Sequence, residues 1–539
     1  MKENNPVEKT PSKWSKYFEI DHWVFWPASI IIVLFIAITL IVGKPMENIF
    51  INIQDRISEY GGWFFVLGMN VFLIFSLYIA LSKFGEIRLG GRTARPEFKT
   101  LSWFAMLFSA GMGIGILFWS VGEPVLHYMN PPIGTAESVE AAQNSMKFTF
   151  LHWGFHAWGV YALVGMSLAF FTFNKKLPLT ISSVFYPLIG ERVNGKLGKM
   201  INVLAVVATL FGLATSLGLG VKQVNAGLNY LFNVPDSVTV QVILIILITL
   251  AATGSVVAGL SGGVKRLSQL NIILAAFFLL FMIIVGPTLF IFGSFVQNAG
   301  AYFQDFFVLS FWTETYAQTD WQKGWTVFYW AWWISWSPFV GMFIARISRG
   351  RTLRQFVLGV LVVPTLLTFF WLSAFGGSAL FLELNNIGDI GTAAQENVAT
   401  SLFVLLEQFP WSSFMSLLGV ILVISFFVTS SDSGSLVVDS LTAGGKLDAP
   451  VAQRIFWALT EGGVAAVLLL GGGLVALQTA SIITGLPFTI ILLVMAYSLH
   501  KGLTQEYDKV LKYSQKQERK TYQEIIGEMI SKKEKKQSL

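Results

Sequence analysis

Residues 108–116 read FSAGMGIGI, and residues 329–341 read YWAWWISWSPFVG. In the first stretch, glycine recurs at three alternate positions of an apolar segment, and each glycine weakens a helix by about 1 kcal/mol relative to alanine. In the second stretch, Pro338 removes a backbone donor and is expected to kink the helix. Interrupted helices in corresponding positions of two halves of a chain point to the substrate site of a transporter. Tight helix packing through small residues is the alternative for the glycines.

The composition indicates that most of the chain lies in a lipid bilayer. Of its 539 residues, 54% are hydrophobic and 13% are charged, whereas soluble proteins carry roughly 25% charged residues. A membrane-spanning helix needs about 20 mostly apolar residues. Twelve segments meet this requirement, and they are 23–43, 62–83, 101–122, 149–173, 200–232, 237–259, 269–296, 324–347, 356–382, 411–433, 451–470 and 476–499.

Several classes of protein are disfavoured by the composition. The chain has no cysteine, which excludes disulfides, thiolate metal sites and a cysteine nucleophile. Its first residues are polar and lack a small-residue cleavage site, so we expect the first span to be retained rather than removed as a signal peptide. The net charge of +6 fits basic cytoplasmic loops better than nucleic-acid binding.

The charge of the loops alternates along the predicted spans. Loops after the second, fourth, sixth and eighth spans are basic, and the loops between them are acidic or neutral. Because basic loops stay in the cytoplasm, this predicts a multi-pass protein of a bacterial-type inner membrane with both termini cytoplasmic. The basic residues are Lys83, Arg88, Arg92, Arg95 and Lys99, then Lys175, Lys176, Arg192, Lys196 and Lys199, then Lys265 and Arg266, then Arg346, Arg349, Arg351 and Arg354.

The two interrupted spans lie five spans apart, which divides an all-α chain into two units of five helices. We expect a cytoplasmic segment, two extra helices, two five-helix repeats and a basic cytoplasmic tail. These parts are residues 1–22, 23–83, 101–296, 324–499 and 500–539. Apolar residues in the tail are spaced as on an amphipathic helix, which would bring its lysines to anionic lipid. A solvated tail is the alternative.

Aromatic residues gather in the middle of two spans, where an interfacial belt would not put them. They share one side of each helix, within about 160° on the eighth span and about 140° on the fourth. They are Trp330, Trp332, Trp333 and Trp336, with Trp153, Trp158 and Tyr161. A quaternary ammonium ion has no N–H to donate, and aromatic faces attract it by about 2 kcal/mol when it is desolvated. No paired acidic residue faces these tryptophans in the sequence, which fits such a ligand. Packing is the alternative for any single tryptophan.

These strings resemble the betaine/choline/carnitine transporter family over nearly all twelve spans. The most specific matches are residues 111–115, 330–341 and 346–351. The resemblance implies two N-terminal helices followed by a leucine-transporter-like 5+5 inverted repeat, and a homotrimer. It further implies a secondary active importer of glycine betaine, for osmoprotection, that works by sodium symport and alternating access. Such a protein is not an enzyme and uses Na⁺ as a coupling ion rather than a cofactor.

The resemblance also assigns residues to the substrate. The family's aromatic box falls on the fourth and eighth spans, with one tryptophan just below it on the cytoplasmic route. The unwound glycine stretch would turn backbone amides toward the substrate carboxylate, at positive helix ends. The substrate-binding residues implied are Trp153, Trp158, Tyr161, Trp333, Trp336, Gly111, Gly113 and Gly115, and the gate or pathway residues are Trp330, Phe343 and Asp432.

One sodium site of the family combines backbone oxygens of the broken third span with hydroxyls of the tenth. The residues that fit it here are Ser109, Met112, Phe426, Thr429 and Ser430. The alternative for the two hydroxyls is a hydrogen bond back to a carbonyl of their own helix. Asp432 follows them inside a span, where a charge is a functional candidate. It would orient the sodium site or close a cytoplasmic gate against Arg346.

A second sodium site of the family joins the fifth span to the residue after the eighth-span proline. Phe339 fits the latter position. On the fifth span the hydroxyl residues are Thr209, Thr215 and Ser216, and their register stays open, as does a stoichiometry of two sodium ions.

Other substrates and other classes of protein fit the sequence less well. A choline carrier would gain from an acidic residue in the glycine stretch, and Gly115 with its neighbours supplies none, which favours a zwitterion. Choline or carnitine transport, proton-coupled or by exchange, is the alternative. A channel would need a filter or a polar ring, and none is visible. For a metal or enzyme site, His152 and His156 lack a third ligand nearby. An osmosensor would rest on the basic tail alone.

Overall fold

The structure is a computed structural model that describes residues 17–111, 113–258, 265–446 and 450–537. Over these residues the chain is helical, with an isolated antiparallel bridge between two loops, so the predicted all-α class is confirmed there. The long helices are α1 His22–Val42, α2 Met46–Leu81, α3 Thr100–Gly111, α4 Ile114–Met129, α5 Val139–Trp153, α6 Phe155–Ala169, α8 Lys196–Phe232, α9 Val238–Ala258, α10 Lys265–Val285, α11 Thr288–Gln304, α14 Thr326–Ile347, α15 Leu353–Leu384, α18 Ser412–Thr442 and α19 Val451–Gln537. The short helices are α7 Tyr186–Ile189, α12 Phe306–Ser310, α13 Trp321–Gly324, α16 Ile390–Glu396 and α17 Ser401–Glu407.

Nine helices of the described residues are long and apolar enough to cross a membrane. The predicted third span is divided into α3 and α4, of 12 and 16 residues, and the predicted seventh into α10 and α11 at Gly286 and Pro287. α14 falls outside the nine, because tryptophans and serines lower its hydropathy. The last two predicted spans both lie in α19, whose backbone is non-helical at Gly472 and Gly473. The twelve spans and the 5+5 repeat stay predictions.

The interruption expected in the third span is present. α3 ends at Gly111, and α4 begins at Ile114 after Gly113, whose backbone is extended at φ −151° and ψ −152°. The fourth span is also broken, which the sequence analysis did not anticipate: α5 ends and α6 begins around Gly154. A Cβ atom on Gly154 would lie 2.4 Å from the carbonyl oxygen of Phe150, so only glycine fits there.

The interruption expected in the eighth span is not found, because α14 continues across Pro338. Proline has no N–H for the carbonyl of Ile334, one turn earlier. The Ser337 hydroxyl donates to that carbonyl instead, over 2.7 Å. This substitute hydrogen bond explains how the helix continues past the proline.

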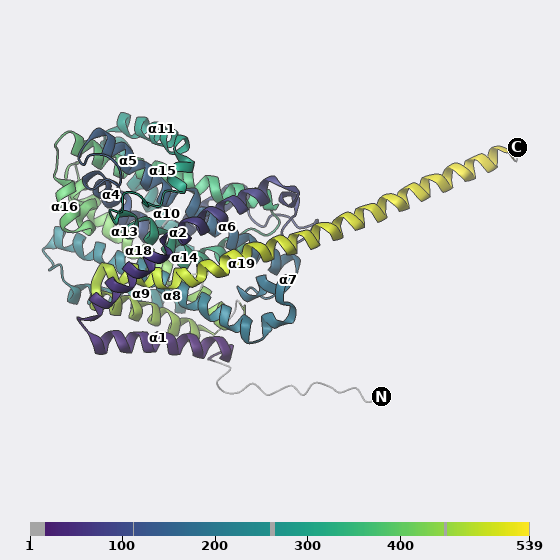
Figure 1. Cartoon of the computed structure of the whole chain (residues 1–539), viewed down its shortest axis with the longest axis horizontal. Coiled ribbons are helices and arrows are strands. Elements are labelled where there is room, and N and C mark those ends of the chain that lie inside the picture. The colour runs from purple at the N-terminus through teal and green to yellow at the C-terminus, as the bar shows by residue number, and fades with distance from the viewer. Residues whose placement is uncertain (1–16, 112, 259–264, 447–449, 538–539) are drawn as a thin grey trace.

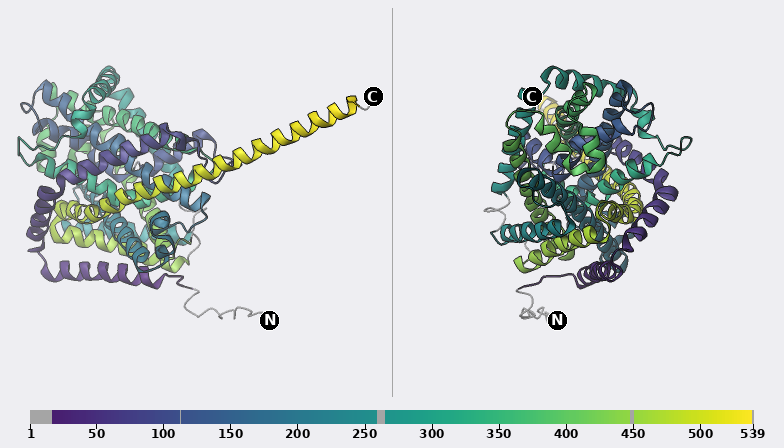
Figure 2. Two further views of the ribbon diagram at one scale, coloured as in Figure 1. Left: turned by 45° about the vertical axis from the view of Figure 1, so that its right-hand side comes forward. Right: turned by 90° about the vertical axis from the view of Figure 1, so that its left-hand side faces the viewer.

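α14 forms the centre of the bundle, against α6, α8 and α19 (Figure 1). Its residues are buried almost without exception, so its aromatic side chains meet neighbouring helices and not lipid. α1 runs along one flank, and its apolar side chains are largely exposed, as expected of a lipid-facing helix (Figure 2).

The C-terminal half of α19 extends far beyond the bundle as one helix (Figures 1 and 2). Near its start, Glu506 pairs with Lys175 at 2.5 Å, and the Lys83 ammonium lies 4.5 Å from the ring of Tyr507. The tail is helical over its described residues, as predicted from the spacing of its apolar residues. Its contact with lipid stays a prediction.

Candidate functional site

Four aromatic rings meet where α5 and α6 face α14. The ring centroid of Trp153 lies 5.0 Å from that of Trp333, with the planes at 71°. Tyr161 lies 6.3 Å from Trp333 at 79°, and 5.6 Å from Trp158 at 83°. All four side chains are buried. The structure thus brings together the four residues predicted for the aromatic box, in edge-to-face pairs, and their binding of a substrate stays a prediction.

Gly115 lies directly against this box. Trp332 stacks on Trp333, with centroids 4.7 Å apart and planes at 14°, and its Nε1 donates to Ser216 Oγ over 3.3 Å. A Cβ atom on Gly115 would lie 2.6 Å from the Trp332 ring and 3.2 Å from the Trp153 ring. The close approach of two indoles therefore requires glycine at position 115.

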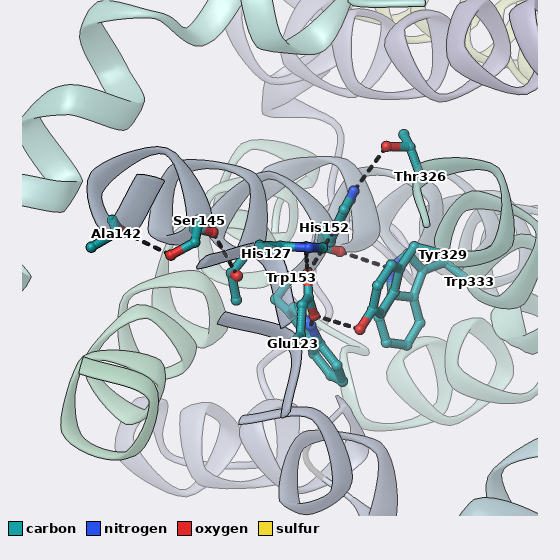
Figure 3. A network of polar contacts seen from close by, with 10 residues as sticks. Glu123, His127, Ala142, Ser145, His152, Trp153, Thr326, Tyr329 and Trp333 are labelled. Carbon is teal, nitrogen blue, oxygen red and sulfur yellow. Dashed lines mark hydrogen bonds and ion pairs between the residues drawn. The ribbon is translucent and has the colours of Figure 1, made fainter. Parts of the chain in front are cut away.

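A buried carboxylate lies behind the box, against the expectation that none would face these tryptophans. Glu123, on α4, is fully buried, and its Oε2 accepts a hydrogen bond from Trp153 Nε1 over 2.7 Å and another from the Tyr329 hydroxyl (Figure 3). Its Oε1 meets His152 Nδ1 at 2.7 Å and His127 Nε2 at 3.3 Å. The carboxylate thus connects α4, α5 and α14 at the box.

The same network fixes the second ring of the box. Trp333 Nε1 donates to the carbonyl oxygen of His152 over 2.8 Å, and His152 Nε2 lies 3.0 Å from Thr326 Oγ1 (Figure 3). Rings of Trp153 and Trp333 are therefore both oriented by hydrogen bonds from their indole nitrogens. These hydrogen bonds hold each indole in one rotamer.

The third span was predicted to end at residue 122, so Glu123 and His127 were assigned to a loop and missed, while Tyr329 was overlooked beside the tryptophans of the eighth span. α4 instead continues to Met129 and carries Glu123 and His127 on one face at i, i+4 spacing. The overlooked signal was this pair, at the distance that brings two side chains together on a helix.

One atom each from Glu123, His127 and His152 lies within 4.8 Å of the others, a spacing that could hold a metal ion. The pair considered from the sequence separates instead, since His156 Nε2 faces Asn70 Oδ1 at 3.3 Å. In the cluster, His127 Nε2 and His152 Nδ1 are directed at the Glu123 carboxylate and serve as its hydrogen-bond donors. The arrangement is that of a hydrogen-bond network centred on this carboxylate.

A cavity of about 400 Å³ lies between α3, α10, α14 and α18, and Trp336, which follows Trp333 by three residues on α14, is part of its lining. It brings together residues that were assigned separately to the glycine stretch, the cytoplasmic route or gate, and the two sodium sites. Those residues are Gly113, Trp336, Phe339, Phe343, Phe426, Thr429 and Ser430. Trp330, predicted for the pathway, packs elsewhere, with its ring 5.3 Å from that of His156.

The hydroxyls of the predicted first sodium site border the gap in the third span. A Cβ atom on Gly113 would lie 3.9 Å from Ser430 Oγ. Thr429 Oγ1 lies 3.0 Å from the carbonyl oxygen of Ser425, which is the intrahelical hydrogen bond named as the alternative. Met112 lies outside the described residues, as does the side chain of Ser109, and Gly111 ends α3.

The fifth-span hydroxyls considered for a second sodium site have other partners. Thr209 donates to its own helix, and Thr215 donates to the Leu477 carbonyl of α19 over 2.7 Å. Together with Ser216, they are absent from the lining of the cavity that contains Phe339, within the described residues. The second site stays a prediction.

The ion pair of Asp432 differs from the one suggested by the sequence. Asp432 Oδ1 lies 3.2 Å from Arg454 Nη2 on α19, where Arg346 was the expected partner, and Ser255 Oγ donates to Oδ2 over 2.7 Å. The reason is helix packing: α18 packs against both α9 and α19, which carry the serine and the arginine.

Comparisons with known proteins identify a transporter family. A family model described as "BCCT, betaine/carnitine/choline family transporter" matches residues 23–508. A glycine betaine transporter of Acinetobacter baylyi is 45% identical over 503 residues, which cover 93% of this chain and 76% of the relative. A glycine betaine/proline/choline transporter of Vibrio parahaemolyticus is 47% identical over 505 residues, covering 90% and 91%. A glycine betaine transporter of Bacillus subtilis is 43% identical over 492 residues, covering 91% and 96%.

Proposed function

This chain belongs to the betaine/carnitine/choline transporter family, and on that premise we propose that it imports glycine betaine by sodium symport and alternating access. The observation that carries the proposal is the buried aromatic box, in which Trp153 and Tyr161 meet Trp333 at 71° and 79°. Aromatic faces attract a trimethylammonium group, which has no N–H for a hydrogen bond. Uptake of such a zwitterion adds solute without net charge, which suits osmoprotection.

The break in the third span supports a zwitterionic substrate. α4 begins at Ile114, so the positive end of its helix dipole lies at Gly113. The Cβ position of Gly113 is 3.9 Å from the ring of Trp336, which itself lies below the box. A substrate carboxylate beside these backbone amides would place its ammonium group toward the aromatic rings.

The names of the relatives support this substrate class and include other substrates. One relative is named for glycine betaine, proline and choline, and another for these and ectoine. Choline or carnitine transport, proton-coupled or by exchange, is therefore the alternative to be tested. Each of these substrates except proline and ectoine carries a trimethylammonium group for the box.

Sodium coupling is supported by the oxygens at the cavity. Thr429 and Ser430 present hydroxyls there, next to the interrupted third span. Ser102 and Ser268 also line the cavity, and they follow the basic residues of two loops predicted to be cytoplasmic. We therefore propose that the cavity opens to the cytoplasm and belongs to an inward-facing state.

The test is uptake of labelled glycine betaine into proteoliposomes under an inward sodium gradient or an inward proton gradient. We expect accumulation that needs sodium and that Trp333→Leu abolishes. Trp371→Leu is the matched control, because Trp371 is also a buried indole but packs on Phe375 in α15. Loss of uptake in Trp333→Leu alone would locate the effect in the box.

Other results would revise the proposal in defined ways. Accumulation driven by protons alone would keep the box and remove the sodium assignment at Thr429 and Ser430. Transport of choline or carnitine without glycine betaine would keep the fold and correct the substrate. An equal loss in Trp333→Leu and Trp371→Leu would mean that any large cavity in the bundle stops uptake.

The remaining proposals concern the membrane and the oligomer. Exposed apolar residues along the tail of α19, beside its lysines, support contact with anionic lipid. They are Leu511, Tyr522, Ile525, Ile526, Met529 and Ile530. Deleting residues 503–539 tests this: uptake with unchanged dependence on external osmolality and on lipid charge would contradict it. A homotrimer stays an expectation from the resemblance, to be checked by the mass of the purified protein.

A further inference from the structure

Glu123 is placed to act on a ligand that it does not touch. Its carboxylate is fully buried at the level of the box, and four donors surround it: an indole, a phenol and two imidazoles. An ionised carboxylate accepts about four hydrogen bonds. All its acceptor positions are therefore occupied by side chains, as Figure 3 shows for the donors from α4, α5 and α14.

With both neighbouring imidazoles neutral, Glu123 keeps a net negative charge. Its ion-pair partners are His127 and His152, which can donate as neutral imidazoles. His127 Nδ1 is buried and has no hydrogen-bond partner among the described residues, so an added proton there would be unsatisfied. Asp432 contrasts with this case, since Arg454 neutralises it.

We propose that Glu123 is the counter-charge of the aromatic box and draws the trimethylammonium group toward Trp153 and Tyr329 without contacting it. This counter-charge proposal rests on the proposed function. It explains how the substrate site would distinguish a cation from a neutral group of equal shape. A buried charge without a cation is costly, and the ligand's ammonium group supplies that cation when it binds. The attraction acts through a medium of low dielectric constant, where it is much stronger than in water.

Two aromatic rings couple this charge to the ligand. The Trp153 indole and the Tyr329 phenol both donate to Glu123 Oε2. A ring whose N–H or O–H donates to an anion becomes richer in electrons, which strengthens the attraction of its face for a cation. Tyr329 lies 5.7 Å from Trp153 and 5.9 Å from Trp333, so it is a further member of the box.

A pair of isosteric ligands separates charge from packing. In 3,3-dimethylbutanoate a neutral carbon replaces the quaternary nitrogen of glycine betaine, and the shape is otherwise retained. We would measure binding of labelled glycine betaine to the purified full chain, and its competition by 3,3-dimethylbutanoate, in the wild type and in Glu123→Gln. The variant keeps the size of the side chain and removes its charge.

We expect Glu123→Gln to weaken glycine betaine binding by about tenfold and to leave 3,3-dimethylbutanoate unchanged or tighter. Glu383→Gln is the control, because Glu383 lies outside the box and accepts a hydrogen bond from the Gly391 N–H. Tyr329→Phe, which keeps the charge and one ring but removes one coupling hydrogen bond, should weaken glycine betaine by about threefold. Tyr329→Phe provides a second test of the counter-charge if Glu123→Gln does not fold.

The outcomes separate this inference from the proposed function. A wild type that binds no trimethylammonium compound would overturn the proposed function, and this inference with it. A wild type that binds glycine betaine, with variants that weaken both ligands equally or neither, would overturn the counter-charge alone. A loss of affinity confined to glycine betaine would support the counter-charge, since a packing defect would weaken two ligands of the same shape equally.

Discussion

The side-chain amide of Asn271, on α10, donates to Thr429 Oγ1 on α18 over 3.1 Å. This hydrogen bond uses a lone pair of the hydroxyl that is proposed to bind sodium. Asn271 Oδ1 is buried and has no partner among the described residues. The amide therefore competes with an ion at Thr429 in this conformation, and its own oxygen is not engaged.

Asn271→Ala should strengthen sodium binding, because the hydroxyl would lose a competing donor. A net hydrogen bond is worth about 1 kcal/mol, so we expect the sodium concentration for half-maximal uptake to fall by about fivefold. Sodium-dependent uptake in proteoliposomes measures this. A rise in that concentration would mean that Asn271 Oδ1 is itself a sodium ligand.

Gly115→Ala should raise the KM for glycine betaine by more than about tenfold, as an overpacked core costs about 1–3 kcal/mol. The added methyl would lie 2.6 Å from the Trp332 ring and must displace it, and with it the stacked Trp333. Gly254→Ala is the control, since a Cβ atom there meets nothing within 4 Å. Equal KM values in both variants would show that the box tolerates movement of its rings.

Ser337→Ala should lower the free energy of unfolding by about 1–2 kcal/mol, because the Ile334 carbonyl would be buried without a donor. Thermal unfolding of the purified protein in detergent measures this. Ser294→Ala, which removes a hydroxyl at a less buried place on α11, should change the midpoint much less. An unchanged midpoint for Ser337→Ala would mean that α14 satisfies this carbonyl in another way.

Breaking the pair between Asp432 and Arg454 should destabilise the protein strongly. Arg454→Gln would leave a buried carboxylate without its cation, at a cost of about 3–5 kcal/mol. Asp432→Asn together with Arg454→Gln should recover part of this loss, since residue 432 would then carry no unpaired charge. The folded yield and unfolding midpoint of the single and double variants measure the coupling, and additive losses would exclude it.

Patterns that act within one helix could be interpreted from the sequence. The glycines of the third span predicted its interruption, because backbone propensity is local, and the tryptophans of the fourth and eighth spans predicted the residues that meet in the box. Helical periodicity puts the tryptophans of α14 on one side before any packing is known, whereas Trp153 and Trp158 lie on two helices separated at Gly154. The interruption predicted at Pro338 was wrong because the hydroxyl of the neighbouring Ser337 donates to the carbonyl that the proline leaves without a donor.

Partners that come from different helices were decided by the tertiary structure alone. Local propensity and periodicity account for an all-helical chain of long apolar segments, a broken third span and an aromatic cluster, all of which could be predicted without the fold. Only packing brought Glu123 to Trp153, Arg454 to Asp432 and Asn271 to Thr429. The physical reason is that buried polar groups must find partners across helix interfaces, and which interface forms depends on the packing of every helix in the bundle.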